Sequence, residues 1–289
     1  MFCNQCQEAA KNIGCAEIGT CGKKDDTAGI QDLLVYACQG LSFATTEARK
    51  QGIDTNAESK HIVNCLFTTI TNGNFDDDML IDYIKQSISY RDNLKSKIKI
   101  AENHDSINWN ASTKEEFITK SKTVGTQTYD ANEDICSLKK YVLFGVKGAA
   151  AYTEHAFNLG FEDKDIYSFI EESLLMLTKS MDLNGMVDWV MKTGELGVKV
   201  MALLDKANTS AFGHQEITNV KLGVGKNPGI LISGHDLKDL EDLLIQSEGQ
   251  GIDIYTHSEM LPAHAYPQFK KYSHLYGNYG GAWHKQLED

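Results

Sequence analysis

The chain has 289 residues, of which 42% are hydrophobic, and its formal net charge is −12. This acidic balance disfavours bulk binding to nucleic acid or to anionic membranes, since both need concentrated lysine and arginine. No apolar run approaches the roughly 18 residues that a membrane-spanning helix needs, and no apolar signal segment precedes Cys3. We therefore expect a soluble, cytoplasmic protein.

Four of the seven cysteines lie within the first 21 residues. Cys3, Cys6, Cys15 and Cys21, here called the N-terminal quartet, have the spacing C-x2-C-x8-C-x5-C. Four thiolates on so short a segment can satisfy one tetrahedral Zn²⁺ or the four irons of one cubane cluster. The remaining cysteines occur singly in apolar stretches, where a free cysteine behaves as a small hydrophobe: Cys38, Cys65 and Cys136.

Three interpretations of the quartet compete, namely disulfides, zinc and an iron–sulfur cluster. A reducing cytoplasm disfavours disulfides. Zinc sites usually have two C-x2-C pairs separated by a long stretch of sequence. Here only eight residues separate the pairs, and the second pair is C-x5-C. A cubane is larger than a single ion and tolerates less regular spacing, so the spacing favours iron–sulfur and leaves zinc open.

Proline is absent from the first 227 residues, which permits long uninterrupted helices. Apolar residues at helical spacing predict a helix from Asp26, with Thr27 as its N-cap and Gly52 as its stop. A second helix around Ile62 should end before Gly73. Three aspartates then open a third helix, because their charges suit the positive end of its dipole: Asp76, Asp77 and Asp78.

After a polar loop at 103–112, the same periodicity predicts helices over Glu133–Leu159, followed by Gly160, and over Lys164–Met181 and Asn184–Ala207. About six long helices with short connections indicate one or two helical bundles, in a domain spanning residues 1–220. The core candidates of these later helices are Leu138, Phe144, Ile166, Phe169, Ile170, Leu174, Leu177, Val187, Val190, Val198 and Met201.

The pattern changes after residue 220. A short apolar run of buried-strand type (Gly229–Ser233), an amphipathic helix (Asp236–Glu248) and a second strand (Ile252–Thr256) form a βαβ unit, whose strands should be parallel. Only two strands are expected, because the chain then runs into a glycine-rich and aromatic loop, Tyr276–Trp283. We therefore expect a multi-domain α + α/β protein whose second domain, 221–289, is incomplete.

Two polar residues follow the predicted strands, where open α/β sheets bind ligands: His235 and Glu259. The plainer interpretation is that Asp236 caps its helix while His235 is an ordinary loop histidine and Glu259 an ordinary surface carboxylate. The nearby His257 and His264 fit loop packing better than proton donation.

Several motifs together resemble the hybrid cluster protein (prismane, or hydroxylamine reductase) family: MFCNQCQEAA, GCAEIGTCGK, ISGHDLKDLEDLL, DIYTHSEMLPAHAYP and GNYGGAW. The resemblance runs over the whole chain, which corresponds to about the first half of a family member. It implies that Cys3, Cys6, Cys15 and Cys21 bind a [4Fe–4S] cluster. It also implies that helical bundles are followed by the start of a Rossmann-like α/β domain, with Trp283 packing near the domain junction.

The resemblance further implies a hybrid [4Fe-2O-2S] cluster, with His235 and Glu259 as two of its ligands. The family's other ligands, several cysteines and a second glutamate, come from a C-terminal half that this sequence lacks. The implied reaction reduces hydroxylamine to ammonia and water, and the family is also linked to nitric oxide and nitrosative-stress defence. The expected partners are the C-terminal half, an electron donor and a small nitrogen-oxide substrate.

The chain alone is then expected to be inactive, with no catalytic residue assigned. Two other classes stay open: a non-catalytic electron-carrier fragment with one cubane, and a zinc-stabilised helical binding module.

Overall fold

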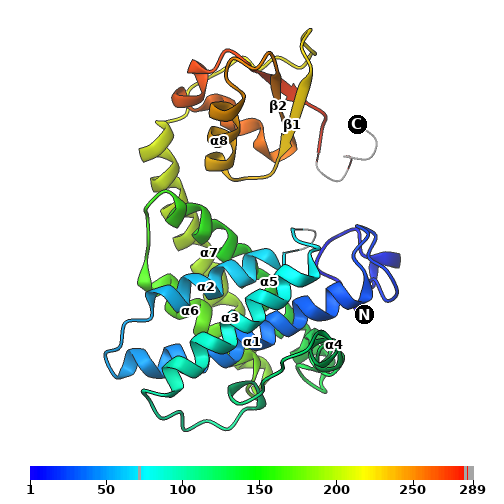
Figure 1. Ribbon diagram of the computed structural model, residues 1–289, viewed down its shortest axis with the longest axis vertical. Helices are drawn as coiled ribbons and strands as arrows, with labels where there is room; N and C mark the ends of the chain where they lie inside the picture. The colour runs from blue at the N-terminus through cyan, green and yellow to red at the C-terminus, as the bar shows by residue number, and fades with distance from the viewer. Residues whose placement is uncertain (71–72, 283–284, 286–289) are drawn as a thin grey trace. The chain divides into compact units, whose positions relative to one another are not determined.

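The computed structural model describes residues 1–70, 73–282 and 285 (Figure 1). It divides into two compact units, the first comprising residues 1–154 and 163–201 and the second residues 155–162 and 202–289. The chain is mostly helical and carries one small parallel sheet, which confirms the α plus α/β class. The proposed domain boundary at residue 220 stays a prediction. Trp283 lies outside the described residues.

The first unit is organised around the long helix α1 (Asp25–Lys50). Helices α2 (Asn56–Thr68), α3 (Asp77–Lys95), α4 (Lys114–Ser121) and α6 (Lys164–Leu177) all contact it. Helix α1 is buried on all sides along its middle and supplies much of the core, with fully buried apolar residues at helical spacing: Ile30, Leu33, Leu34, Leu41 and Ala44. The predicted long helices of this region are confirmed.

Residues at the start of a helix can satisfy its first amides or its dipole, and the predicted N-cap of α1 is wrong. Helix α1 begins at Asp25, and Thr27 lies buried within its first turn instead of capping it. The two acidic residues that open α1, Asp25 and Asp26, suit the positive end of its dipole. The three aspartates open α3 as predicted, and Asp76 is its N-cap, since its carboxylate accepts hydrogen bonds from the amides of Asp78 and Met79.

Helix α4 was not predicted from the sequence. It begins with a capping box in which the Thr113 hydroxyl accepts from the amide of Glu116, while the Glu116 carboxylate accepts from the amide of Thr113. Three short 3₁₀ turns complete this region: η1 (Ala10–Asn12), η2 (Asp105–Ile107) and η3 (Thr126–Thr128).

Two more long helices, α5 (Glu133–Asn158) and α7 (Leu183–Phe212), contribute residues to both units. Gly160 follows α5 with a φ of +83°, a conformation that glycine adopts freely, as its predicted place after the helix requires. The predicted core on α6 is confirmed for Ile166, Ile170, Leu174 and Leu177, which are buried, while Phe169 is only partly buried. The predicted core on α7 is partly wrong, because three of its residues are exposed: Val187, Val198 and Met201.

The second unit holds a three-stranded sheet in the order β1 (Gly229–Ser233), β2 (Asp253–His257) and β3 (Leu275–Tyr279). Both strand pairs are parallel, and α8 (Leu237–Ser247) connects β1 to β2, which confirms the predicted βαβ unit. The expectation of only two strands is wrong, since β3 forms inside the segment predicted as a loop. Two 3₁₀ helices connect β2 to β3: η4 (Ser258–Ala265) and η5 (Pro267–Lys271).

The core of this unit lies on one side of the sheet. Leu240 and Leu244 of α8 are fully buried with Ile254 of β2 and with Phe269, whose ring stacks on Phe212 at a centroid distance of 4.9 Å. The expectation that β1 is a buried strand is wrong, because Ile230 and Leu231 are 37% and 52% exposed. The physical reason is that β1 is an edge strand, paired on one side by β2. No helix in the described part of the chain is both long and apolar enough to cross a membrane.

Candidate metal centres

The N-terminal quartet lies in a loop that backbone hydrogen bonds fold back on itself. The amide of Cys3 donates to the carbonyl of Cys15 at 3.0 Å, and the amide of Cys15 donates to the carbonyl of Cys3 at 2.8 Å. Between them the chain turns through Lys11 and Asn12, which both have a φ of +57°. Non-glycine residues adopt this left-handed conformation at some cost, so the reversal is a specific feature of the loop.

The quartet thiols act on one another electrostatically. Burial raises the pKa of Cys6; the charges of Cys3, Cys21 and Cys15 raise it further, against a backbone hydrogen bond from Glu8. The pKa of Cys15 is lowered, mainly by the amides of Ala10 and Thr20, and the amide of Ala10 donates to the Cys15 sulfur at 3.4 Å. Four free thiols that repel one another as thiolates suit a cationic metal centre, which would relieve the repulsion.

The quartet's donor chemistry therefore fits a four-thiolate iron–sulfur cluster. Cys15 is buried while Cys21 is exposed, so one edge of such a centre would lie at the surface. Hydrogen bonds to sulfur, of the kind that Ala10 provides, are among the features that set the potential of such clusters.

The other three cysteines are buried among helices of the first unit. The Cys65 sulfur lies 3.3 Å from Nε2 of His61, and the Cys136 thiol donates to the carbonyl of Thr126 at 3.3 Å. Burial raises the pKa of Cys65 well above its ordinary value, and its neighbour Cys38 adds to the shift. A buried neutral thiol is a poor metal ligand, so these contacts are consistent with structural roles.

His235 and Glu259, predicted from the strand ends, lie together in the second unit. Nε2 of His235 is 2.6 Å from a carboxylate oxygen of Glu259. The register of the sheet explains the approach, since Ser233 and His257 are paired at the carboxyl ends of β1 and β2 and the two residues follow directly. Both side chains are accessible, with exposures of 44% and 58%.

The residue before each member of this pair has a left-handed backbone. Gly234 precedes His235 with a φ of +126°, and Ser258 precedes Glu259 with a φ of +52°. Glycine adopts such angles freely, but for serine they carry strain, of the kind that often occurs at functional sites. The backbone thus turns sharply after each strand and brings the two side chains together.

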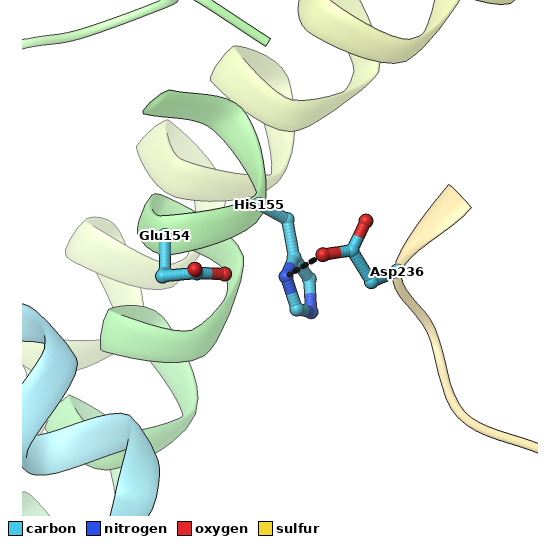
Figure 2. A group of neighbouring side chains, drawn as sticks. All are labelled: Glu154, His155 and Asp236. Atoms are coloured by element: carbon cyan, nitrogen blue, oxygen red, sulfur yellow. Dashed lines mark ion pairs between the residues drawn. The ribbon is translucent and has the colours of Figure 1, made fainter. Parts of the chain in front are cut away.

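Asp236, next to His235, is fixed by two contacts. Its carboxylate accepts from the amide of Lys238 at 2.7 Å, as the N-cap of α8, and lies 3.2 Å from Nδ1 of His155 (Figure 2). Burial acts to raise the pKa of Asp236, but His155 and the helix amides outweigh it and hold the pKa below its ordinary value. The capping role was recognisable from the sequence. The partner His155 was not, because it lies far away in the sequence and matches no motif.

His257 and His264 have partners within the sheet region. Nδ1 of His257 lies 3.1 Å from the Ser233 hydroxyl, and Nε2 of His264 lies 2.9 Å from the Thr256 hydroxyl. Burial lowers the pKa of His264 and so favours its neutral form, although a hydrogen bond from its ring to the backbone of Gly277 acts to raise the pKa. These contacts favour the packing role for both residues.

Comparison with known proteins identifies the family of the chain. The model of the Prismane/CO dehydrogenase family matches residues 1–289. Curated hydroxylamine reductases are similar over essentially all of the chain: 52% identical in Parabacteroides distasonis, 50% in Desulfosudis oleivorans and 48% in Chlorobaculum tepidum.

The match covers 99–100% of this chain but only 52–54% of those proteins, so the chain spans about half the length of the curated relatives it matches. With a family model that covers every residue and relatives at about 50% identity, the chain belongs to the Prismane/CO dehydrogenase family.

Proposed function

We propose that this chain is part of an iron–sulfur oxidoreductase that reduces hydroxylamine to ammonia and water. The proposal rests on the family membership and on the name shared by the relatives. The observation that carries it in this molecule is the meeting of His235 and Glu259 at the ends of two parallel strands. The sheet is proposed to be the start of a Rossmann-like domain, and three parallel strands around a βαβ unit support this.

The quartet is proposed to hold one [4Fe–4S] cluster, through which electrons enter. Its four thiols would be the cluster's complete set of protein ligands. The exposed position of Cys21 supports a role in accepting electrons from a donor protein, because electron transfer requires close approach of the two centres.

His235 and Glu259 are proposed as two ligands of the hybrid cluster. His235 would bind through a neutral imidazole nitrogen and Glu259 through a carboxylate oxygen, donors that suit iron not fully ligated by sulfur. Two ligands are too few to hold a four-iron cluster, and the chain has no cysteine after Cys136. The remaining ligands would come from the part of the relatives that this chain does not match.

The overall reaction consumes two electrons and two protons: NH₂OH + 2e⁻ + 2H⁺ gives NH₃ + H₂O. The hybrid cluster, when bound, would supply Lewis acidity and electrons at an open iron position. The chain's own residues position that centre. The left-handed turns at Gly234 and Ser258 direct His235 and Glu259 to one point, while Asp236 fixes the loop through its contact with His155. Nitric oxide reduction and nitrosative-stress defence belong to the same proposal.

One observation favours a second role for the chain by itself. The quartet is a complete ligand set, whereas the second site is partial. Alone, the chain would therefore carry electrons without catalysing the reaction.

Anaerobic reconstitution of the purified chain with iron and sulfide tests the quartet assignment. We expect about four irons and four acid-labile sulfides per chain, with an electron paramagnetic resonance signal after reduction. Zinc bound in place of iron, with no sulfide, would refute the iron–sulfur proposal and favour the zinc-stabilised module.

A further inference from the structure

A buried lysine lies beneath the N-terminal quartet. Lys147 of α5 is only 3% exposed, and its ammonium group donates to the side-chain oxygen of Gln5 at 3.2 Å and to the carbonyl of Thr69 at 3.4 Å. Gln5 lies in the C-x2-C segment, between Cys3 and Cys6. Burying an ammonium is costly unless it is paired, so a lysine at this place requires an explanation.

The surroundings of Lys147 are charged. Asp32 of α1 is the main counter-charge of Lys147. The buried Lys23 is also close enough to lower the pKa of both residues. A small cavity between the quartet loop and the helices is lined by Cys3, Gln5, Lys23 and Asp32, among others. The ammonium therefore belongs to a polar cluster that borders the cysteine loop.

Lys147 keeps its charge near neutral pH despite its burial. Burial lowers the pKa of Lys147 to about 8; Asp32 and Cys3 act to raise it, and Lys23 to lower it. Burial raises the pKa of Asp32 to about 6, against the nearby lysines. At pH 7.5 the pair is thus mainly an ammonium and a carboxylate.

We infer that Lys147 is a positioning residue for the N-terminal cluster: its buried charge favours the reduced state, and its hydrogen bond to Gln5 holds the C-x2-C segment. The inference rests on the proposed iron–sulfur cluster. Reduction by one electron adds a negative charge to the cluster, and a fixed cation nearby stabilises that charge more strongly in a weakly screened interior than in water. Net charge and hydrogen bonds near the sulfurs are established determinants of such potentials.

The test is a redox titration of the reconstituted chain at pH 7.5, followed by electron paramagnetic resonance. We expect Lys147→Met to make reduction about tenfold less favourable, which is a potential about 59 mV lower for a one-electron couple. Lys147→Arg should keep the potential near the wild-type value, because a guanidinium keeps the positive charge at this position. An unchanged potential in Lys147→Met would overturn the inference.

Lys139 offers a matched control. It lies on the same helix, is 1% exposed, and donates to the carbonyls of Tyr129 at 3.0 Å and Lys179 at 2.8 Å. None of these partners belongs to the quartet loop, so Lys139→Met should lose stability but keep the wild-type potential. An equal shift in both lysine variants would indicate a general effect of disturbing α5 and would also overturn the inference.

Two further outcomes are decisive. If Lys147→Met does not fold, Lys147→Gln decides, since it also removes the charge and an unchanged potential in that variant contradicts the inference. If the wild-type chain takes up no iron–sulfur cluster, the proposed function fails before any variant is compared. Failure of the function and failure of the inference are therefore distinguishable.

Discussion

The seven cysteines of this chain occupy two kinds of environment. The quartet thiols sit together in one short loop and repel one another as thiolates, whereas Cys38, Cys65 and Cys136 are buried among helices. We predict that alanine at Cys15 abolishes or converts the cluster signal of the reconstituted chain, because a cubane needs all four thiolates.

Cys38→Ala is the matched control, since Cys38 is likewise a buried cysteine outside any disulfide. It should cost some stability through lost packing and leave the spectrum intact. The opposite pattern, with the signal lost in Cys38→Ala and kept in Cys15→Ala, would show that the quartet is misassigned.

The proposed ligands His235 and Glu259 can be tested in the complete protein. Alanine at His235 or Glu259 should remove hydroxylamine reduction and spare the N-terminal cluster signal, because the two centres lie in different units of the chain. His214→Ala, which removes an exposed histidine of the same unit, should keep full activity. Full activity in the Glu259→Ala enzyme would contradict the ligand assignment.

At the scale of elements, a buried histidine joins two helices. Nε2 of His61, on α2, lies 2.8 Å from the Ser87 hydroxyl of α3, and its ring meets that of Tyr90 edge-on at a centroid distance of 5.2 Å. Burial lowers the pKa of His61 to about 4. In the unfolded chain its pKa would be about 6.5, so the unfolded state binds the proton first as the pH falls.

The contribution of His61 to stability is therefore complete above pH 6.5 and declines as the pH falls toward 4. We predict that acidification from pH 7 to pH 5 costs the wild-type chain about 2 kcal/mol more than it costs His61→Gln. Urea unfolding curves of both proteins at the two pH values measure the difference, and titrating groups common to both cancel. Equal losses in the two proteins would show that His61 is not buried in its neutral form.

The same scale shows what the sequence could predict. Long helices such as α3 and α5 were recognisable, because their apolar residues recur at helical spacing and because Asp76 marks the start of α3 and Gly160 the end of α5. Strand β3 was not, because Gly277 and Asn278 are weak strand formers and the strand depends on its pairing with β2. A Cβ at Gly277 would lie 2.3 Å from the carbonyl of Lys221, so this glycine permits a close backbone approach that only the folded chain reveals.

Some features of the candidate sites could likewise be predicted from the sequence, and others could not. His235 and Glu259 could be placed from the general rule on strand ends, and the quartet from its spacing. The contacts of His155 with Asp236 and of Lys147 with Gln5 could not be placed, because each joins residues far apart in the sequence with no local pattern. Val187 and Val198 were wrongly assigned to the core, since periodicity identifies an apolar face without showing what covers it.

At the scale of the whole molecule, the second unit exposes apolar surface along one edge of its sheet. Ile230 and Leu231 of β1 are accessible, with exposures of 37% and 52%. An edge strand with exposed apolar side chains is a site for association. The relatives contain a further segment that is similar in length to this chain. We propose that this segment covers the edge in the complete protein.

The isolated chain should therefore associate with itself at micromolar concentration, and Leu231→Lys should reduce this association by placing a charge on the edge. Sedimentation velocity over a range of concentrations measures it. Ile245→Lys is the control, because Ile245 is similarly exposed but lies on α8, away from the strand edge. A wild-type chain that stays monomeric and resists proteolysis across 221–289 would show that this edge needs no cover, and equal effects of the two lysine substitutions would show that the association does not involve β1.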